Sequence, residues 1–381
     1  MKKYLYATTA IIGVTAVATG AQAQGVDANI GGFINGYYGV ADIDNGTNDD
    51  TQELNYQEAE LNITGSVTLD NGVEAGVFIQ NELEGGFAEA DEQYLYMKGS
   101  FGTLRLGQQD SAAYWTSAFG SQPYAAGVPI NSGWEGFANA FGNYDGNFLA
   151  PGYTTYGGLV DDDNGIVYFS PRVAGLQLGL SWHPDSGSGQ GAFLSANGGT
   201  GGFINAVDEN TSENNAITVG LNFSRDFNGI GIDASAGYAT EDRDDMGSAA
   251  PRFDAAEDPN QYMGGLAVSV AGFSFGGDIL IQDEGVRFAG NSNEGEAYSL
   301  GGSYSVGPWT AGLNGIYSEI EGDTSIDGDD SRLAISGGLD YAMGPGITLS
   351  SSVLYQEIGS EERGDGQTEI LGGLLGATVS F

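Results

Sequence analysis

The chain lacks the residues on which most catalytic and metal sites depend. Its 381 residues include no cysteine and one histidine, His183. Without cysteine there is no disulfide framework and no thiolate metal ligand. A single histidine excludes paired imidazole ligands and leaves little basis for histidine-based acid–base catalysis. Because no set of nucleophile, acid and base can be assembled from the sequence, we expect a protein that is not an enzyme.

Basic residues are also scarce. Lys and Arg number 11 against 51 Asp and Glu, which gives a formal net charge of −40. Nucleic-acid binding depends on Lys and Arg that neutralise phosphates, so this composition excludes nucleic-acid partners. A surface of this sign attracts cations instead.

Long apolar runs are missing as well. The N-terminus has a basic start with Lys2 and Lys3, an apolar stretch at 10–19 and an A-Q-A sequence at 21–23. This pattern predicts a signal peptide at 1–23, cleaved after Ala23, and a mature domain at 24–381. An anchor helix is the alternative, but the apolar stretch is far shorter than the ~20 residues that a span needs. A chain without spanning helices can cross a membrane only as a closed β-barrel.

Glycine and aromatic residues are plentiful, with 65 Gly, 20 Tyr and 18 Phe. The aromatic content argues against disorder. Residues 216–224 alternate strictly, with Ile217, Val219 and Leu221 on one side and Thr218 and Asn222 on the other. Residues 60–69 and 332–341 repeat the pattern. A period of two predicts strands with two different faces. In a membrane barrel these faces meet lipid and a water-filled lumen.

The connections between these segments indicate the number of strands. Seven tight turns contain Gly, Asn, Asp or Pro, and they lie at 69–72, 98–102, 171–175, 225–229, 271–272, 306–308 and 342–346. Such residues supply the backbone angles of short hairpins. Eight longer loops separate them, near 41–53, 85–91, 110–164, 183–215, 240–260, 283–296, 319–331 and 357–368. Fifteen connections predict an all-β fold: a transmembrane antiparallel β-barrel of sixteen strands, wide enough to hold an aqueous channel.

Aromatic residues cluster near the predicted strand ends, among them Tyr37, Tyr94, Phe169, Trp309 and Tyr355. An interfacial girdle on a membrane barrel predicts this placement. Ordinary enrichment of aromatics in strands is the alternative.

Three segments together resemble the Gram-negative porin family. YLYMKGSFGTLRLG at 94–107 is similar to that family's hairpin before the pore-constricting loop, with its K-G-x-F-G turn. NGIVYFSP at 164–171, followed by AGL at 174–176, resembles the strand that resumes after that loop. The last strand, 371–381, ends in Phe381 and resembles the family's assembly signal. The resemblance covers essentially the whole mature chain.

The resemblance implies a general-diffusion porin in the outer membrane of a Gram-negative bacterium. It implies a homotrimer that contacts outer-membrane lipid and lipopolysaccharide, and a long loop folded into the lumen. Small, glycine-rich outer faces on the early strands also favour close approach between barrels. The sequence departs from the family where Gln108 and Gln109 stand in place of a frequent arginine.

Residues 110–164 are therefore the predicted constriction loop, because a segment of this length without periodicity is too long for a simple connection between two strands. A surface loop over the barrel mouth is the alternative. Arg105 alternates with Leu104 and Leu106, so its parity, meaning its place in this alternation, directs it toward the lumen. At the constriction we place Arg105 opposite Glu135 or Asp145 of the loop, with Glu58 and Glu60 nearby. Opposed charges there would create a transverse field, and replacing Arg105 with Glu should sharpen cation preference.

Further lumen-facing acids are predicted by parity at Asp233, Asp278 and Asp340. Because acids outnumber the one mid-strand base, we expect a cation-preferring channel for ions and small hydrophilic solutes. Fully solvated carboxylates with little effect at physiological salt are the alternative.

The acidic loops offer weak metal-site candidates in Asp161, Asp162 and Asp163. Oxygen-rich loops can bind Ca²⁺, but solvated acidic loops are the simpler interpretation. No other cofactor is expected. Two further functions remain open: a substrate-specific outer-membrane channel, for example for sugars, and a secreted calcium-binding β-protein. The second would show a short fixed repeat, which is absent.

Overall fold

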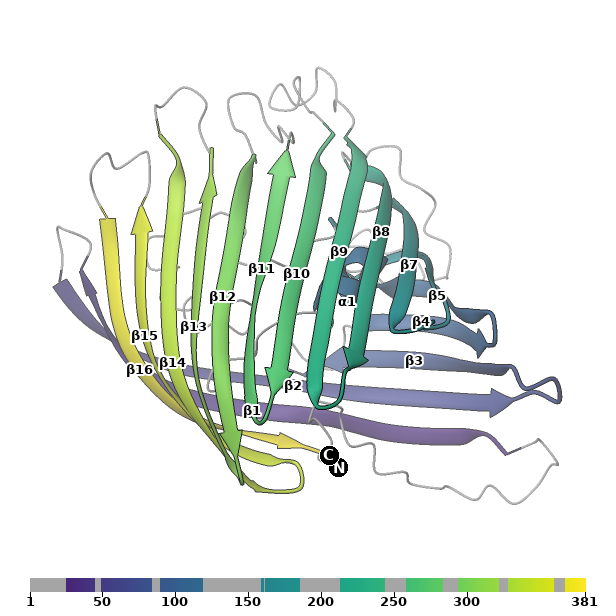
Figure 1. Ribbon diagram of the computed structural model, residues 1–381, viewed down its shortest axis with the longest axis horizontal. Helices are drawn as coiled ribbons and strands as arrows, with labels where there is room; N and C mark the ends of the chain where they lie inside the picture. Colours follow the sequence, from purple (N-terminus) through teal and green to yellow (C-terminus); the bar gives the residue numbers. More distant parts are fainter. Residues whose placement is uncertain are drawn as a thin grey trace, which may run out of the picture.

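The computed structural model describes residues 25–44, 49–83, 90–118, 159–160, 162–185, 213–243, 258–283, 294–321, 328–359 and 367–381. They form sixteen strands and one short helix (Figure 1). The elements are β1 (Asp27–Asp44), β2 (Asp49–Thr68), β3 (Glu74–Glu82), β4 (Ala90–Gly99), β5 (Gly102–Gln109), α1 (Ala112–Ala118), β6 (Asp163–Phe169), β7 (Leu176–Asp185), β8 (Glu213–Asp226), β9 (Ile230–Arg243), β10 (Asn260–Val270), β11 (Phe273–Asp283), β12 (Gly295–Val306), β13 (Trp309–Ile320), β14 (Asp330–Gly344), β15 (Ile347–Gly359) and β16 (Gln367–Ser380).

Each strand pairs antiparallel with its neighbours in chain order, and β16 pairs with β1 to close the barrel. The predicted sixteen-strand barrel is therefore confirmed. Within the described residues, no helix has the length and apolar character needed to cross a bilayer.

The two faces of each strand differ as the alternation predicted. On β8, Ile217 and Leu221 are 49% and 43% exposed on the outer face, while Thr218 and Asn222 point inward and are buried. Large apolar side chains stand exposed along the outside of most strands. In water this surface would be costly, whereas lipid accepts it.

The hairpins at one rim follow the predicted turn chemistry. Asn228-Gly229 and Ala271-Gly272 both have two successive residues with positive φ, between 52° and 92°. This is the backbone of a two-residue type I′ turn, whose twist matches that of the flanking strands.

The first long connection is shorter than predicted. We expected a loop at 41–53, but Ala41 to Asp44 pair in register with Asp49 to Gln52. Ala41 and Ile43 are 1% exposed on the inner face, and Asp42 and Asp44 are exposed on the outer face. The alternation therefore continues through this acidic stretch, and the density of Asp residues wrongly suggested a loop.

The aromatic residues form two outer belts, but not all of those predicted belong to them. Near the short turns, Phe273 packs on Tyr304 and Trp309 on Tyr341, with ring centroids 4.4 and 4.5 Å apart. Near the long-loop rim lie Tyr38, Trp182, Tyr262, Tyr298 and Tyr317, all exposed. Tyr37, Tyr94 and Phe169 instead share the parity of inward residues, so the girdle prediction was wrong for them.

The inner wall is not uniformly polar. One buried inward cluster joins β1 and β13–β16 and consists of Ala41, Ile43, Ile316, Ala334, Leu354, Ile358, Ile370 and Leu374. A second cluster lies on β9–β12, where Ala239, Met263, Leu280 and Ala297 pack against Ala113 of α1 and Leu159. Part of the lumen face is therefore a packing surface and not a lining of the channel.

Candidate functional site

The long connection after β5 begins inside the barrel. Its first element, α1, lies against the inner faces of β7, β8 and β9 (Figure 1). Ser111 caps the helix, with its hydroxyl accepting from Tyr114 N at 3.2 Å and its carbonyl from Trp115 N at 3.1 Å. The start of the predicted constriction loop is therefore folded into the lumen. Glu135 and Asp145 lie outside the described residues.

Two wall hydroxyls meet the remaining free N–H groups of the first turn. Ala112 N donates to Ser181 Oγ and Ala113 N to Thr218 Oγ1, each at 3.1 Å. These hydroxyls are themselves 2.7 Å apart and buried. The first turn of a helix has no intrahelical acceptors, so the wall supplies what α1 would otherwise lack.

Arg105 points inward, as predicted, but it is enclosed by aromatic rings. Its Cζ atom lies 4.8 Å from the centroid of Tyr94, 5.0 Å from Trp115 and 5.1 Å from Phe169. Tyr94 is on β4, Phe169 on β6 and Trp115 on α1, so the guanidinium joins the helix to two strands. Cation–π contacts of this kind contribute about 0.5–2 kcal/mol each. The arrangement makes Arg105 a support of α1 as much as a charge in the pore.

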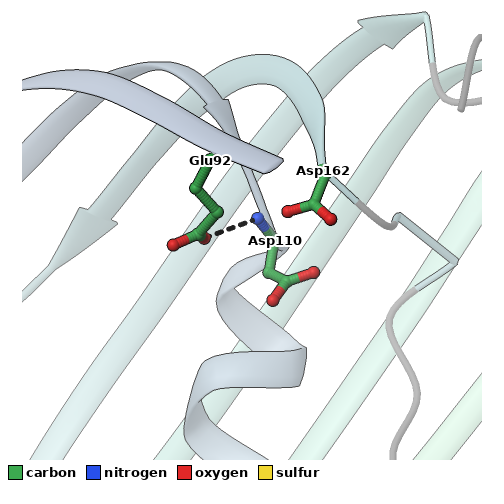
Figure 2. Close-up of side chains that lie close together, drawn as sticks. All are labelled: Glu92, Asp110 and Asp162. Carbon is green, nitrogen blue, oxygen red and sulfur yellow. Dashed lines mark hydrogen bonds between the residues drawn. The ribbon is translucent and has the colours of Figure 1, made fainter. Parts of the chain in front are cut away.

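Three carboxylates come together where the loop leaves and rejoins the wall (Figure 2). Glu92 of β4, Asp110 before α1 and Asp162 before β6 have oxygen atoms within 4.8 Å of one another. Glu92 is 3% exposed and accepts a hydrogen bond from Asp110 N at 3.3 Å. Of the predicted metal candidates only Asp162 belongs to this group. Asp163 is buried at the start of β6, and Asp161 lies outside the described residues.

The other predicted acids lie on the inner side of the strands. Glu58 on β2 pairs with Asn35 and accepts from its Nδ2 at 2.7 Å, and Glu60 lies one inward position further along. Asp233 and Asp340 are partly exposed on β9 and β14. Asp278 is only 9% exposed and accepts from Ser299 Oγ at 3.3 Å, so it is less open than a lumen charge was expected to be.

Sequence reasoning missed several residues of this region. His183, to which we assigned no role, is fully buried, and its ring occupies the space above Gly165. Ser181 and Thr218 showed inward parity in the sequence, which could have marked them as wall residues. Their contact with α1 could not be read from parity, because it joins positions 69 and 105 residues apart.

Comparison with known proteins agrees with this geometry. A family model described as Gram-negative porin matches residues 7–360. The fold resembles an anion-selective porin from Comamonas acidovorans, with a TM-score of 0.60 and 15% identity over 93% of this chain and 100% of that one. It also resembles a loop-deletion mutant of the outer membrane protein OmpT of Vibrio cholerae, with a TM-score of 0.59 and 11% identity over 93% and 99% of the two chains.

A mutant porin of Rh. blastica is similar at a TM-score of 0.52 and 17% identity, covering 93% of this chain and 100% of that one. No curated protein sequence matches the chain. At these identities the structures establish the fold, and the family model establishes the relationship. The chain belongs to the Gram-negative porin family.

Proposed function

We propose that this outer-membrane channel passes ions and small hydrophilic solutes by passive diffusion and prefers cations. The observation that carries the preference is the sign of the inward-facing charges. Glu58, Glu60, Asp233 and Asp340 face inward and are not fully buried. Of the inward bases whose side chains the structure describes, Arg105 is enclosed by rings and Arg332 is 1% exposed. Lys98 is exposed at the short-turn end of β4, where it lies opposite Glu74. The charges open to the lumen are therefore mostly negative.

Acidic crowding at the long-loop rim adds to this field. Asp329 lies between β13 and β14, and its pKa is raised by partial burial and by the nearby carboxylates of Glu319, Glu321 and Asp330. The carboxylates that add to the effect of burial are themselves a local surplus of negative charge at this rim. A potential of a few kT over the mouth would enrich cations several-fold at low salt.

Neutralising Glu58 and Glu60 together, as Glu58→Gln and Glu60→Gln, is expected to lower the cation preference. The change should be largest at low salt, because the Debye length shrinks from about 30 Å at 0.01 M to about 3 Å at 1 M. The measurement is the reversal potential in a salt gradient across a planar bilayer. Glu357→Gln with Glu369→Gln is the matched control, because this pair removes the same two charges from the outer face. Anion preference in the native channel, or equal shifts in both variants, would contradict the proposal.

A sugar-specific channel is the second function considered. Most of the aromatic residues that would form its binding track lie at 119–158, outside the described residues. Of the two that are described, Tyr114 and Trp115 of α1, Trp115 packs against Arg105. The described part of the chain offers no observation that favours this function. A channel of this family needs no catalytic group, and we propose no enzymatic activity. Cleavage after Ala23 also remains a proposal, which N-terminal sequencing of the exported protein tests.

We also propose a homotrimer. The OmpT protein of V. cholerae, similar at a TM-score of 0.55, has been described in a trimer form. Here Ile30 and Ile34 stand 50% and 43% exposed on the outer face of β1, and nothing lies within 4 Å of a Cβ placed at Gly36 between them and Tyr38. Such a face permits close barrel packing in lipid. A native mass in detergent equal to one chain would contradict it.

We also propose that lipopolysaccharide contacts the outer face of the barrel near the long-loop rim. Glu296 and Glu319 lie directly opposite each other on β12 and β13, beside the paired Tyr298 and Tyr317. Tyr317 donates to Glu319 at 2.6 Å. Like charges at opposed positions repel, and divalent cations between these carboxylates and lipid phosphates would relieve that repulsion. Lipopolysaccharide that copurifies equally well before and after EDTA treatment would contradict this bridge.

Loop-bound Ca²⁺, predicted at Asp161, Asp162 and Asp163, remains a prediction. The structure groups Asp162 with Glu92 and Asp110, and we propose these three carboxylates as the ligands. Ca²⁺ prefers several oxygen ligands in a flexible arrangement, which three converging carboxylates begin to provide. Asp110→Asn is expected to weaken Ca²⁺ binding by about tenfold or more, since one charged ligand of three is lost. Titration calorimetry on the folded protein measures it, and Asp283→Asn, an exposed strand-end carboxylate, is the control. No heat of binding in the native protein would contradict the prediction.

A further inference from the structure

Three glycines lie side by side on the inner wall beneath α1. Gly179 on β7 pairs with Gly220 on β8, and Gly220 pairs with Gly237 on β9. All three share the parity of the inward Ser181 and Thr218. Three adjacent inward positions without side chains leave a strip of bare backbone, and a helix can approach such a strip more closely than any other part of the wall.

The helix makes use of this space. Ala112 and Ala113 of α1 are 0% exposed. A Cβ placed at Gly179 would lie 3.2 Å from the Ala112 Cβ, and one placed at Gly237 would lie 3.6 Å from the Ala113 Cβ. The small residues of the helix therefore face the glycines of the wall, and the two backbones approach each other directly.

Polar contacts fix the helix at both ends of the glycine strip. The hydroxyls of Ser181 and Thr218 accept hydrogen bonds from its first N–H groups. These two residues are the next inward pair from the glycines toward the long-loop rim. Asn222 is the next inward residue from Gly220 toward the short-turn rim. Its Nδ2 donates to Thr116 O at 3.4 Å, and Arg172 Nη2 donates to Asn222 Oδ1 at 2.6 Å. Arg172 belongs to the turn between β6 and β7. The position of α1 is therefore set by the wall itself.

Gly220 is the tightest point of this contact. A Cβ there would collide with Thr116 Oγ1 and would lie 2.8 Å from Thr116 Cβ and 2.9 Å from the Ala112 carbonyl oxygen. A side-chain hydroxyl can rotate away, but a helix carbonyl cannot move without the helix. In a close-packed contact, an added methyl group must displace one of the two partners. The strands at Gly220 are held by the hydrogen bonds between neighbouring strands, so the helix is the partner that moves.

We propose that Gly220 is a positioning residue that sets how far α1 stands from the wall, and thereby the width of the channel. The residue acts through α1 and does not touch the solute. This inference rests on the proposed function, because a width has a functional meaning only if the chain conducts.

Gly220→Ala and Gly220→Val test this as a graded pair. Each is expected to push α1 into the lumen and lower the single-channel conductance stepwise, by on the order of 10–50%, as packing resists the added volume. Gly231→Ala is the matched control. Gly231 is an inward glycine of β9 whose added Cβ would meet mainly the hydroxyl of Ser269, which can rotate. Conductance is read in planar bilayers, and solute size cut-off in liposome swelling, using protein shown to be folded by its heat-dependent migration.

The outcomes separate this inference from the proposed function. Folded Gly220 variants that conduct as the native channel does, or conduct more, would overturn the inference and leave the channel function standing. A native protein that forms no channel would overturn the proposed function. If the Gly220 variants do not fold, Thr218→Val replaces them, because it keeps the side-chain shape and removes the acceptor of Ala113 N. We expect its current to fluctuate between levels, and a steady native current would overturn the inference.

Discussion

Deleting Phe381 is expected to remove most of the assembled barrel from the outer membrane. The main chain of this residue extends the seam, the pairing of β16 with β1 that closes the barrel. Phe381 N donates to Gly32 O at 3.0 Å, and Gly32 N donates to Phe381 O at 3.1 Å. Its ring shares the outer face with Leu375 and Val379, which are 69% and 44% exposed. Two hydrogen bonds at about 1 kcal/mol each and about 2 kcal/mol for the ring in lipid would be lost together.

Variants at the seam separate its two contributions. Phe381→Ala keeps both main-chain bonds and loses the ring, so a defect equal to the deletion assigns the effect to the ring. Gly32→Ala tests the backbone, because a Cβ there would collide with the carbonyl oxygen of Glu60 on β2 and shift the main chain of Gly32 that bonds Phe381. Gly36→Ala is its control on the same strand and face, with nothing within 4 Å of the added Cβ. The measurement is the folded fraction in outer membranes, read by heat-dependent migration. Native levels in the deletion would contradict the terminal-signal interpretation.

The features that the sequence predicted correctly are those that depend on neighbouring residues. A period of two assigns Glu58 and Asp233 to the inner face without any knowledge of the fold, because successive side chains alternate. The register across a short hairpin follows in the same way: the Asn228-Gly229 turn already aligns Gly220 with Gly237. Strand number and barrel class follow from repeating these local rules along the chain.

The features that escaped prediction depend on contacts between segments that the strand alternation alone does not bring together. Parity alone could show that Arg105 points inward, but its enclosure depends on Trp115, which reaches it only because α1 folds back on the wall. The Glu92, Asp110 and Asp162 group forms where the ends of the paired strands β4, β5 and β6 meet, and Asp162 reaches it only after the whole long connection. Composition also misled in one place, where the Asp residues at 42 and 44 suggested a loop and the strand in fact continues.

Replacing Arg105 with glutamate is expected to displace α1 from the barrel wall. This effect goes beyond the sharper cation preference predicted from the change of charge alone. The guanidinium contacts three rings, at about 0.5–2 kcal/mol each. Its positive charge also interacts with the buried Glu92. The substitution would bury a second carboxylate beside Glu92, and an uncompensated buried charge costs about 3–5 kcal/mol. We therefore expect a lower urea midpoint and an unstable open-channel current.

Two further variants show whether Arg105 supports the helix or acts as a pore charge. Arg225→Glu is the control. Arg225 lies at the exposed end of β8 and stacks on a single ring, Phe227, at 5.1 Å, so its replacement should change stability by less than about 1 kcal/mol. Arg105→Met keeps an unbranched side chain between the rings but removes the charge, together with the guanidinium and its cation–π contacts, without adding a carboxylate beside Glu92. If Arg105→Met shifts the reversal potential toward cations while the urea midpoint of Arg105→Glu stays native, the pore-charge role stands and the support role fails. If Arg105→Glu lowers the midpoint by several times the effect of Arg225→Glu, the arginine holds the helix in place, because only an enclosed charge makes a reversal of sign so costly.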